Sequence, residues 1–494
     1  MKMRKLFSLL LATCIILVCF VACNGEDTDK TPETSESTPE INDGGDNPDL
    51  EPIDGGGREF TFLGRVYNEG SSAYVFKYSE IEDTGEAGEP VNKAVVERNY
   101  FIEEKYNIGI VMKKQTANSI VTTLNTDVHA GLSTYDVVMP MLNTAALAAC
   151  NGLLTEWNRI PFVDETKDYW MTELFNYTSI GGYHFFCPGD LNISAYNTVQ
   201  TVFFNKEMHS ELQLEDVYSL VKQNQWTLEK MAEMAAQAGR DILGDGPGTP
   251  DDYYGIISAT MIWQPLLYSS GLILVTKDDN DIPSMTALKG DSERFYNVVE
   301  DITELMNTFN TAATTNALEI SGNVKFRMGE ALFWVECIYG QYVLVDMEAD
   351  YGIVPIPTWQ AGDSYISNLH AGYSSVSAIP SNASDLELAG SVLEDMAYYS
   401  QQMVIPEYYE RTIHLRNLRD EQSYEMLDII FEHIIVDPAL IMSLTVDTDI
   451  RDIVANNKKD TIVSTLQSNL SIYETVIYDI AAAFCQVGAK QYGY

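Results

Sequence analysis

Two periods of apolar residues run through the chain, and together they predict an α/β fold. Residues 59–63 alternate apolar and polar side chains, as a strand does, whereas residues 91–106 place apolar side chains at helical spacing. A β-rich run at 108–112, a helical pattern at 119–130 and a short apolar strand at 135–140 follow. This order predicts a mostly parallel sheet with helices on both faces.

The second half of the chain repeats the same kinds of element. Because residues 60–494 are too many for a single hydrophobic core, we expect two α/β lobes. Thr227 is a candidate N-cap, since its hydroxyl can accept a hydrogen bond from a first-turn amide. The predicted strands are 201–205, 254–257, 331–335 and 351–357, and the predicted helices are 206–212, 228–238, 262–268, 292–309, 386–400 and most of 412–490.

Residues 1–22 have the pattern of a secretory signal peptide. Basic residues among the first five precede an apolar run at 6–22, which is shorter than the about 20 residues that span a membrane. Ala22 and Cys23 resemble the end of a bacterial lipobox, in which the cysteine is acylated, for example with palmitate, and becomes the mature N-terminus. Phe20 stands where that motif usually has leucine, so an uncleaved anchor stays open as the alternative. Either way, the body is expected at the extracellular face of the membrane.

Residues 23–57 form a lipid-anchored linker in this interpretation. Residues 24–57 contain 11 Asp and Glu against one Lys, and they are rich in Pro, Gly, Ser and Thr. Such a composition cannot bury a core, so it predicts a disordered tether with a root-mean-square span of about 30 Å. The globular part would be held close to the membrane.

The charge of the chain excludes several classes of partner. Asp and Glu number 72 against 30 Lys and Arg, and loss of residues 1–22 removes three basic residues, which takes the net charge from −42 to −45. Nucleic acid is therefore not expected as a partner, and neither are anionic lipid surfaces or polyanions bound by a broad basic patch. Neutral ligands are favoured.

Cysteine and histidine spacing gives no metal or disulfide assignment. Cys150, Cys187, Cys337 and Cys485 remain in the mature body beside Cys23, and two disulfides among these four could pair in three ways. Small buried hydrophobic residues are the simpler interpretation. The six histidines never fall at metal-ligand spacing.

A possible calcium loop lies at residues 241–252. Asp241, Asp245 and Asp252 occupy positions 1, 5 and 12 of a 12-residue loop with Gly246 at position 6, as in an EF-hand. Leu243 occupies position 3, where an oxygen ligand is expected, and Asp is shorter than the usual bidentate Glu at position 12. A solvated turn remains the alternative, and no other cofactor is expected.

Several segments, taken in order, resemble the extracellular solute-binding protein family that includes maltose-binding protein. No single segment is diagnostic, because each is short and apolar, and the identification rests on their order and spacing over about residues 58–430. The segments are Tyr135-Asp136-Val137-Val138, Gly152-Leu153-Leu154, Phe203-Phe204-Asn205-Lys206-Glu207, Trp226-Thr227, Asp245-Gly246, Asp252-Tyr253-Tyr254-Gly255, Phe326-Arg327-Met328-Gly329-Glu330-Ala331-Leu332-Phe333 and Tyr351-Gly352-Ile353-Val354-Pro355-Ile356-Pro357.

The resemblance implies a two-lobed, class II periplasmic-binding-protein-like fold with a ligand cleft between lobes joined by three crossing segments. By that pattern, lobe 1 would be residues 58–190 plus 345–385, and lobe 2 residues 195–340 plus 390–494. It further implies a monomer that captures a small neutral solute by hinge closure. The solute expected is a mono- or oligosaccharide. The closed form would deliver the solute to the permease subunits of an ABC transporter.

Candidate ligand-binding residues combine flat aromatic rings with amide and carboxylate groups, because a sugar offers apolar faces and a rim of hydroxyls. The resemblance places Trp263 and Gln264 on lobe 2, although a core Trp beside a surface Gln is the open alternative. Asn143 and Thr144 follow the strand at 135–140, at the carboxyl edge of its sheet. The remaining candidates are Tyr339, Glu336, Tyr408 and Tyr409.

Two other functions stay open. A surface-anchored glycoside hydrolase needs two carboxylates at a fixed separation. A pair such as Glu336 with Asp136 can be proposed, but among 72 acids such a pair carries little information. The sequence has no nucleophile elbow, phosphate loop or HExxH motif, which favours a protein that is not an enzyme. A peptide-binding receptor of the same fold is the other alternative.

Overall fold

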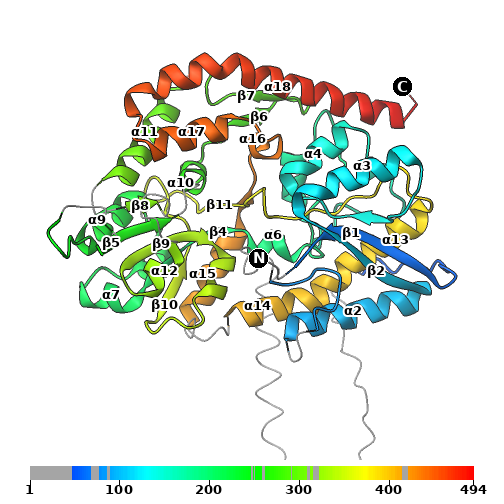
Figure 1. The fold of residues 1–494 in the computed structure, drawn as a ribbon, viewed down its shortest axis with the longest axis horizontal. Coiled ribbons are helices and arrows are strands. Elements are labelled where there is room, and N and C mark those ends of the chain that lie inside the picture. The colour runs from blue at the N-terminus through cyan, green and yellow to red at the C-terminus, as the bar shows by residue number, and fades with distance from the viewer. Residues whose placement is uncertain are drawn as a thin grey trace, which may run out of the picture. The chain divides into compact units, whose positions relative to one another are not determined.

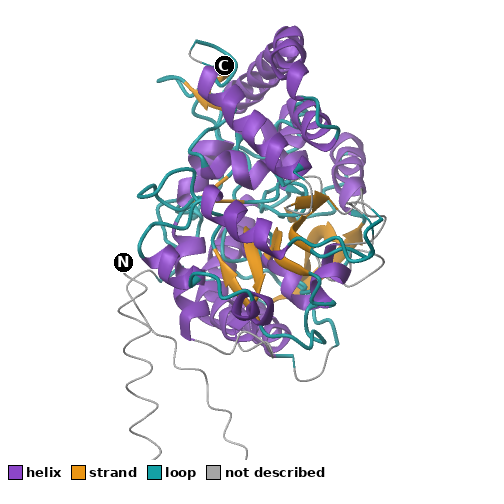
Figure 2. Cartoon of the chain, turned by 90° about the vertical axis from the view of Figure 1, so that its left-hand side faces the viewer, coloured by secondary structure: helices purple, strands orange, loops and turns teal. Residues whose placement is uncertain are grey.

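The computed structural model describes residues 47–67, 77–85, 89–245, 249, 251–258, 262–290, 292–308, 312–314, 322–413 and 421–493. The predicted signal peptide, Cys23 and most of the predicted linker lie outside the described residues. Figure 2 shows helices lying outside the strands. An α/β fold is therefore confirmed for the part of the chain that the structure describes.

The first sheet contains the predicted strand, helix, strand, helix, strand unit. β1 (Arg58–Arg65) lies between β2 (Ile108–Gln115) and β3 (Val137–Val138), and both neighbours run parallel to it. The helices α2 (Pro90–Tyr106) and α3 (Ile120–Ala130) connect these strands, and α4 (Leu142–Cys150) follows β3. Glu89 caps α2 by accepting a hydrogen bond from the Asn92 amide. We call this sheet and its helices lobe 1.

The second sheet has five strands in the order β10-β4-β9-β5-β8 and forms the centre of lobe 2. β5 (Tyr254–Ser258) runs parallel to β9 (Ala331–Cys337) and to β8 (Ala312–Thr314), whereas β4 (Gln200–Asn205) runs antiparallel to β9 and to β10 (Tyr351–Val354). α9 (Leu228–Ala238) packs against β5. Thr227 caps α9, as predicted.

The other helices and strands complete both lobes (Figure 1). They are α5 (Thr172–Thr178), α6 (Ile193–Asn197), α7 (Lys206–Glu211), α8 (Val217–Lys222), α10 (Trp263–Ser269), β6 (Val275–Lys277), β7 (Pro283–Met285), α11 (Glu293–Asn307), α12 (Gly322–Arg327), β11 (Ser367–Asn368), α13 (Leu386–Tyr399), α14 (Ile405–Ile413), α15 (Glu421–Glu432), β12 (Ile434–Ile435), α16 (Pro438–Ile441), α17 (Val446–Ala455) and α18 (Ile462–Gln491), with short turns η2 (Ala117–Ser119), η3 (Trp157–Arg159), η4 (Ile338–Val343), η6 (Lys459–Thr461) and a π-helical turn η5 (Ser400–Val404).

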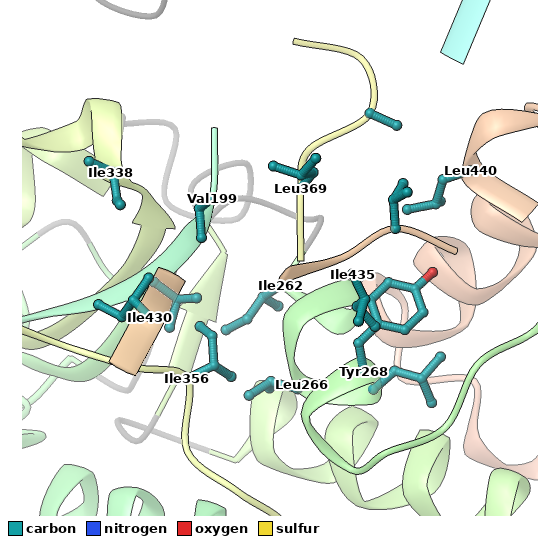
Figure 3. Packing of buried hydrophobic residues seen from close by; sticks show 14 of the residues in the cluster. Val199, Ile262, Leu266, Tyr268, Ile338, Ile356, Leu369, Ile430, Ile435 and Leu440 are labelled. Carbon is teal, nitrogen blue, oxygen red and sulfur yellow. The ribbon is translucent and has the colours of Figure 1, made fainter. Parts of the chain in front are cut away.

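Three segments from distant parts of the chain lie side by side at the junction of the lobes. Val199 bridges to Leu369, and β11 pairs in parallel with β12, in which Ile435 lies opposite Asn368. Figure 3 shows Val199, Leu369 and Ile435 near Ile262. Burial of these apolar side chains holds the three segments together.

The pairing places two segments differently from the expected lobe boundaries. β10, expected in lobe 1, adds to the lobe 2 sheet, because it pairs with β4. Residues 390–413, expected in lobe 2, form most of α13 and all of α14, and both helices pack on α2 of lobe 1. Ala378, by contrast, bridges to Val138 beside the first sheet, in the lobe where it was expected. An apolar strand can pair at the edge of either sheet, so its sequence does not specify its partner.

Candidate functional site

The carboxyl ends of strands from both lobes supply the candidate site. Arg65 ends β1, Asn143 follows β3, and Glu336 lies near the end of β9. In parallel α/β sheets these edges carry the ligand-binding groups. The site thus draws side chains from both lobes.

Four tyrosines, which we call the cross-lobe tyrosines, make contacts between the lobes. The rings of Tyr339 on η4 and Tyr373 on lobe 1 lie 6.2 Å apart between centroids, nearly edge to face. Tyr342 on η4 and Tyr78 on lobe 1 lie 5.5 Å apart at 88°. The Lys77 ammonium lies 4.9 Å from the Tyr342 ring centroid and 5.4 Å from that of Tyr78. Such contacts favour the relative orientation of the lobes seen here.

The lobe 1 side of this aromatic group is held by two neighbours. Arg65 Nη1 donates a hydrogen bond to the Tyr373 carbonyl at 3.2 Å. The His370 ring stacks on the Tyr373 ring at 4.3 Å and 13°. Burial lowers the pKa of His370 to about 4. His370 is therefore neutral at pH 7 and adds a flat ring without a charge.

Glu336 places a hydrogen-bond acceptor beside the same rings. Its Oε1 atom accepts from the Tyr339 hydroxyl at 2.9 Å and from the Cys337 amide at 2.9 Å. Burial raises the pKa of the Glu336 carboxyl, while these two hydrogen bonds oppose the rise. A carboxylate next to aromatic rings can accept hydrogen bonds from ligand hydroxyls, so this corner suits a polyhydroxylated molecule.

Asn143 and Thr144 lie at the amino end of α4. The Asn143 amide donates to the Ala371 carbonyl at 3.1 Å, and its side-chain Nδ2 lies 3.5 Å from where a Cβ on Gly372 would be. Asn143 is therefore next to the segment that carries His370 and Tyr373. The Thr144 hydroxyl donates to the Met141 carbonyl at 2.9 Å, within its own helical turn.

Tyr408 and Tyr409 pack behind the cross-lobe tyrosines rather than beside them. Both are buried on α14, and the Tyr408 hydroxyl donates to Asn197 Oδ1 at 3.2 Å. The Tyr408 ring is 6.4 Å from the Tyr78 ring. Tyr409 packs on Phe431 at 5.5 Å. Tyr408 therefore supports the Tyr78 ring from behind, whereas Tyr409 is part of the packing around Phe431.

Trp263 and Gln264 are packed inside the protein. Every residue of α10 is buried, and Trp263 has no exposed surface. Gln264 Nε2 donates to Asp447 Oδ1 on α17 at 2.7 Å. The structure thus agrees with a core position for Trp263, whereas Gln264 is buried instead of lying on the surface. A helix that is buried on every side gives no periodic signal for which face meets a ligand.

Sequence reasoning missed Arg65, Tyr78, Tyr342, Tyr373 and His370. Arg65 carried a usable signal, because it ends the first predicted strand at the carboxyl edge of its sheet. The others lie in turns and loops whose partners are distant in sequence. No periodicity marks such positions.

The predicted calcium loop brings its three acids together. One carboxylate oxygen from each of Asp241, Asp245 and Asp252 lies within 4.8 Å of the others. Buried Asp252 accepts hydrogen bonds from the amides of Ile242 at 3.3 Å and Thr249 at 3.1 Å. The side chain of Leu243 at position 3 is exposed and apolar and offers no oxygen ligand, and Gly246 at position 6 lies outside the described residues. An all-oxygen donor set of this kind fits a hard cation such as calcium.

The carboxylate pair proposed for a hydrolase and the cysteine pairs proposed for disulfides are not formed in the described part of the chain. Asp136 lies at the amino end of β3 and forms an ion pair with Arg58 at 2.8 Å, so it is at the opposite edge of its sheet from the candidate site that contains Glu336. The proposed hydrolase pair is therefore not formed. Cys150, Cys187, Cys337 and Cys485 are all free thiols.

Comparison with known proteins identifies the fold. No protein-family model and no curated protein matches the chain. The chain is similar to the structure of an ABC transporter solute-binding protein from Thermotoga lettingae bound with α-D-tagatose, at 13% identity and a TM-score of 0.55, covering 85% of this chain and 100% of that one. It is also similar to the cyclic α-maltosyl-1,6-maltose binding protein from Arthrobacter globiformis, at 14% identity and a TM-score of 0.55, covering 86% of this chain and 99% of that one. A third similar structure is a cyclo/maltodextrin-binding protein complexed with maltotetraose, at 11% identity and a TM-score of 0.53, covering 87% of this chain and 96% of that one. These likenesses confirm the two-lobed solute-binding-protein fold.

Proposed function

We propose that this chain is a solute-binding protein that captures a small neutral carbohydrate between its lobes and delivers it to an ABC transporter permease without altering it chemically. The observation that carries the proposal is the group of cross-lobe tyrosines with Glu336, which comes from both lobes at the carboxyl ends of their strands. Three proteins of the same fold are sugar-binding proteins or were solved with a bound sugar.

Hinge closure follows from the same geometry. The lobes are joined at the three segments that meet around Val199, Leu369 and Ile435, so rotation about this junction opens or closes the site. A ligand that contacts Tyr373 and Tyr339 together would bind the closed form more tightly and shift the equilibrium toward it.

A thermal-shift panel of mono- and oligosaccharides, peptides and polyamines tests the proposal. A ligand at 100 times its Kd stabilises by about 2.7 kcal/mol. Tyr339→Ala and Glu336→Gln are expected to lower sugar affinity at least tenfold by calorimetry, whereas exposed Tyr478→Phe serves as the control and leaves it unchanged. Stabilisation by peptides alone, or release of cleaved sugar, would contradict the proposal and point to a peptide receptor or a glycoside hydrolase.

We also propose that Cys23 is acylated and anchors the protein to the extracellular face of the membrane through the 23–57 tether. The basis is the basic and apolar leader followed by Ala22-Cys23. Cys23→Ser is expected to move the protein from the membrane fraction to the medium. Retention of the variant in membranes would favour the uncleaved anchor.

We also propose that the loop with Asp241, Asp245 and Asp252 binds calcium. Three carboxylates within 4.8 Å repel one another unless a cation neutralises them. Calcium is expected to raise the melting temperature of the native chain, and Asp245→Asn to remove that rise. An equal melting temperature with calcium and with a chelator would identify the loop as a solvated turn.

A further inference from the structure

α18 is a single helix that contacts both lobes. It has 30 residues and is thus about 45 Å long, and it lies at the top of Figure 1. Its amino-terminal half packs on α11 and α17, and α11 in turn packs on β8 of lobe 2. Gln467 Nε2 donates to the Leu288 carbonyl at 2.9 Å, and Tyr473 donates to the Asp449 carboxylate on α17. This half is attached to lobe 2.

The carboxyl-terminal end of α18 is attached to lobe 1. The Gln491 side chain donates from Nε2 to the Leu154 carbonyl at 2.8 Å and accepts at Oε1 from the Glu156 amide at 2.9 Å. The Tyr492 hydroxyl donates to Glu156 Oε2 at 2.6 Å. Leu154 itself bridges to Pro380, beside the first sheet. We call residues 488–492 the anchor of α18.

Gly488 shows how closely the anchor approaches lobe 1. A glycine in a helix interior costs about 1 kcal/mol relative to alanine, so its presence there needs a reason. A Cβ at this position would lie 2.3 Å from Cδ1 of Tyr183. The Tyr183 ring therefore lies directly against the helix backbone, where only glycine leaves room.

The length and composition of this part of the chain also suit a membrane span, so the packing of α18 decides between two interpretations. Residues 459–491 pass the length and hydropathy criteria for crossing a membrane. However, one face of α18 is buried in the hydrophobic core through Leu466, Tyr473, Ile477 and Phe484, whereas Ile472 and Tyr478 on its other face are exposed. The helix is therefore used to bridge the lobes.

We propose that α18 is a strap that limits rotation between the lobes. A helix is stiff, and both of its halves are attached, so a change in the angle between the lobes must break the hydrogen bonds of Gln491 and Tyr492 or move the helix from lobe 2. The β6–β7 hairpin adds a second restraint, since Lys277 at the end of β6 donates to the Ser179 carbonyl at 2.5 Å. The biological purpose of the strap rests on the proposed function. The restraint itself does not, because it acts on the unliganded protein.

Pulsed electron–electron double resonance, which measures the distance between two spin labels, tests the strap on the unliganded full chain. Spin labels on non-natural amino acids at exposed Leu132 in lobe 1 and exposed Met328 in lobe 2 avoid the native thiols. The double variant Gln491→Ala and Tyr492→Phe is expected to widen the distance distribution at least twofold. Tyr478→Phe, on the same helix but exposed, is the matched control and is expected to keep the wild-type width.

Gly488→Ala provides a second variant that does not depend on the double substitution folding. Alanine favours the helix but displaces Tyr183, so the distribution is expected to widen while the helical circular dichroism is retained. Wild-type width in both variants would overturn the strap. That result would leave sugar binding intact, whereas a failed ligand panel would remove the proposed function and leave the strap standing.

Discussion

Asp437 is a buried carboxylate at the junction of the lobes, and its titration gives a quantitative prediction. It follows β12 and caps α16, where Oδ1 accepts from the Ala439 amide at 2.8 Å. Its Oδ2 accepts from the Leu274 amide at 2.5 Å, and the side chain has no exposed surface. Burial raises the pKa of Asp437 to about 7, although the hydrogen bonds from backbone amides oppose the rise.

The sign of the effect on stability follows from proton binding in the two states. The unfolded carboxyl has a pKa near 3.8, so between about pH 4 and pH 7 the folded state keeps a proton that the unfolded state has lost. The free energy of unfolding therefore falls as pH rises through this window and levels off above it. From pH 5 to pH 8 the contribution of Asp437 is a loss of about 2.5 kcal/mol.

Asp437→Asn removes this titration, because an amide does not ionise. It also leaves one backbone amide without an acceptor, which costs about 1–3 kcal/mol at every pH. Urea unfolding of both proteins at pH 5, 6, 7 and 8 cancels the titration of all other groups in the difference. That difference is expected to change by about 2.5 kcal/mol in favour of the variant between pH 5 and pH 8. Exposed Asp479→Asn is the control, and a difference constant to within about 0.5 kcal/mol would refute the reasoning for Asp437.

Three further predictions concern buried residues and are measured by urea unfolding at pH 7. Trp263→Ala is expected to lower the free energy of unfolding by about 3–5 kcal/mol because it empties a fully buried site, and an unchanged value would contradict that burial. Gly255→Ala places a Cβ 2.3 Å from the Ala235 carbonyl oxygen, which cannot move aside, so a loss of about 1–3 kcal/mol is expected and wild-type stability would be contrary evidence. Tyr408→Phe removes the hydroxyl that donates to Asn197 and keeps the buried ring, so it is expected to cost about 1 kcal/mol, whereas a loss as large as that of Trp263→Ala would indicate another role.

Local sequence determined most of the elements. The apolar periods of residues 58–138 predicted the order of β1, α2, β2, α3 and β3, which the structure confirms. Strand and helix periods are properties of neighbouring residues, so they can be read without knowing the fold. The end of β10 at Val354, three residues earlier than predicted, fits the prolines at 355 and 357, which cannot donate to a ladder.

The candidate site was predicted only in part. Glu336, Tyr339 and Asn143 lie where the two lobes meet, whereas Trp263 and Gln264 are in the core and Tyr408 and Tyr409 lie behind the site. Composition and residue type indicated the chemistry. They did not indicate which aromatic rings face each other.

Local patterns were enough to predict the helices and strands of this protein, and its composition fixes the acidic charge. The three-dimensional packing was needed to learn that β10 joins lobe 2, that Tyr78 packs on Tyr342 and that α18 contacts both lobes. The physical reason is that periodicity records which side of an element is buried, while the partner it is buried against depends on how distant segments cross. Contacts between residues more than 140 positions apart, as all three of these are, leave no local pattern.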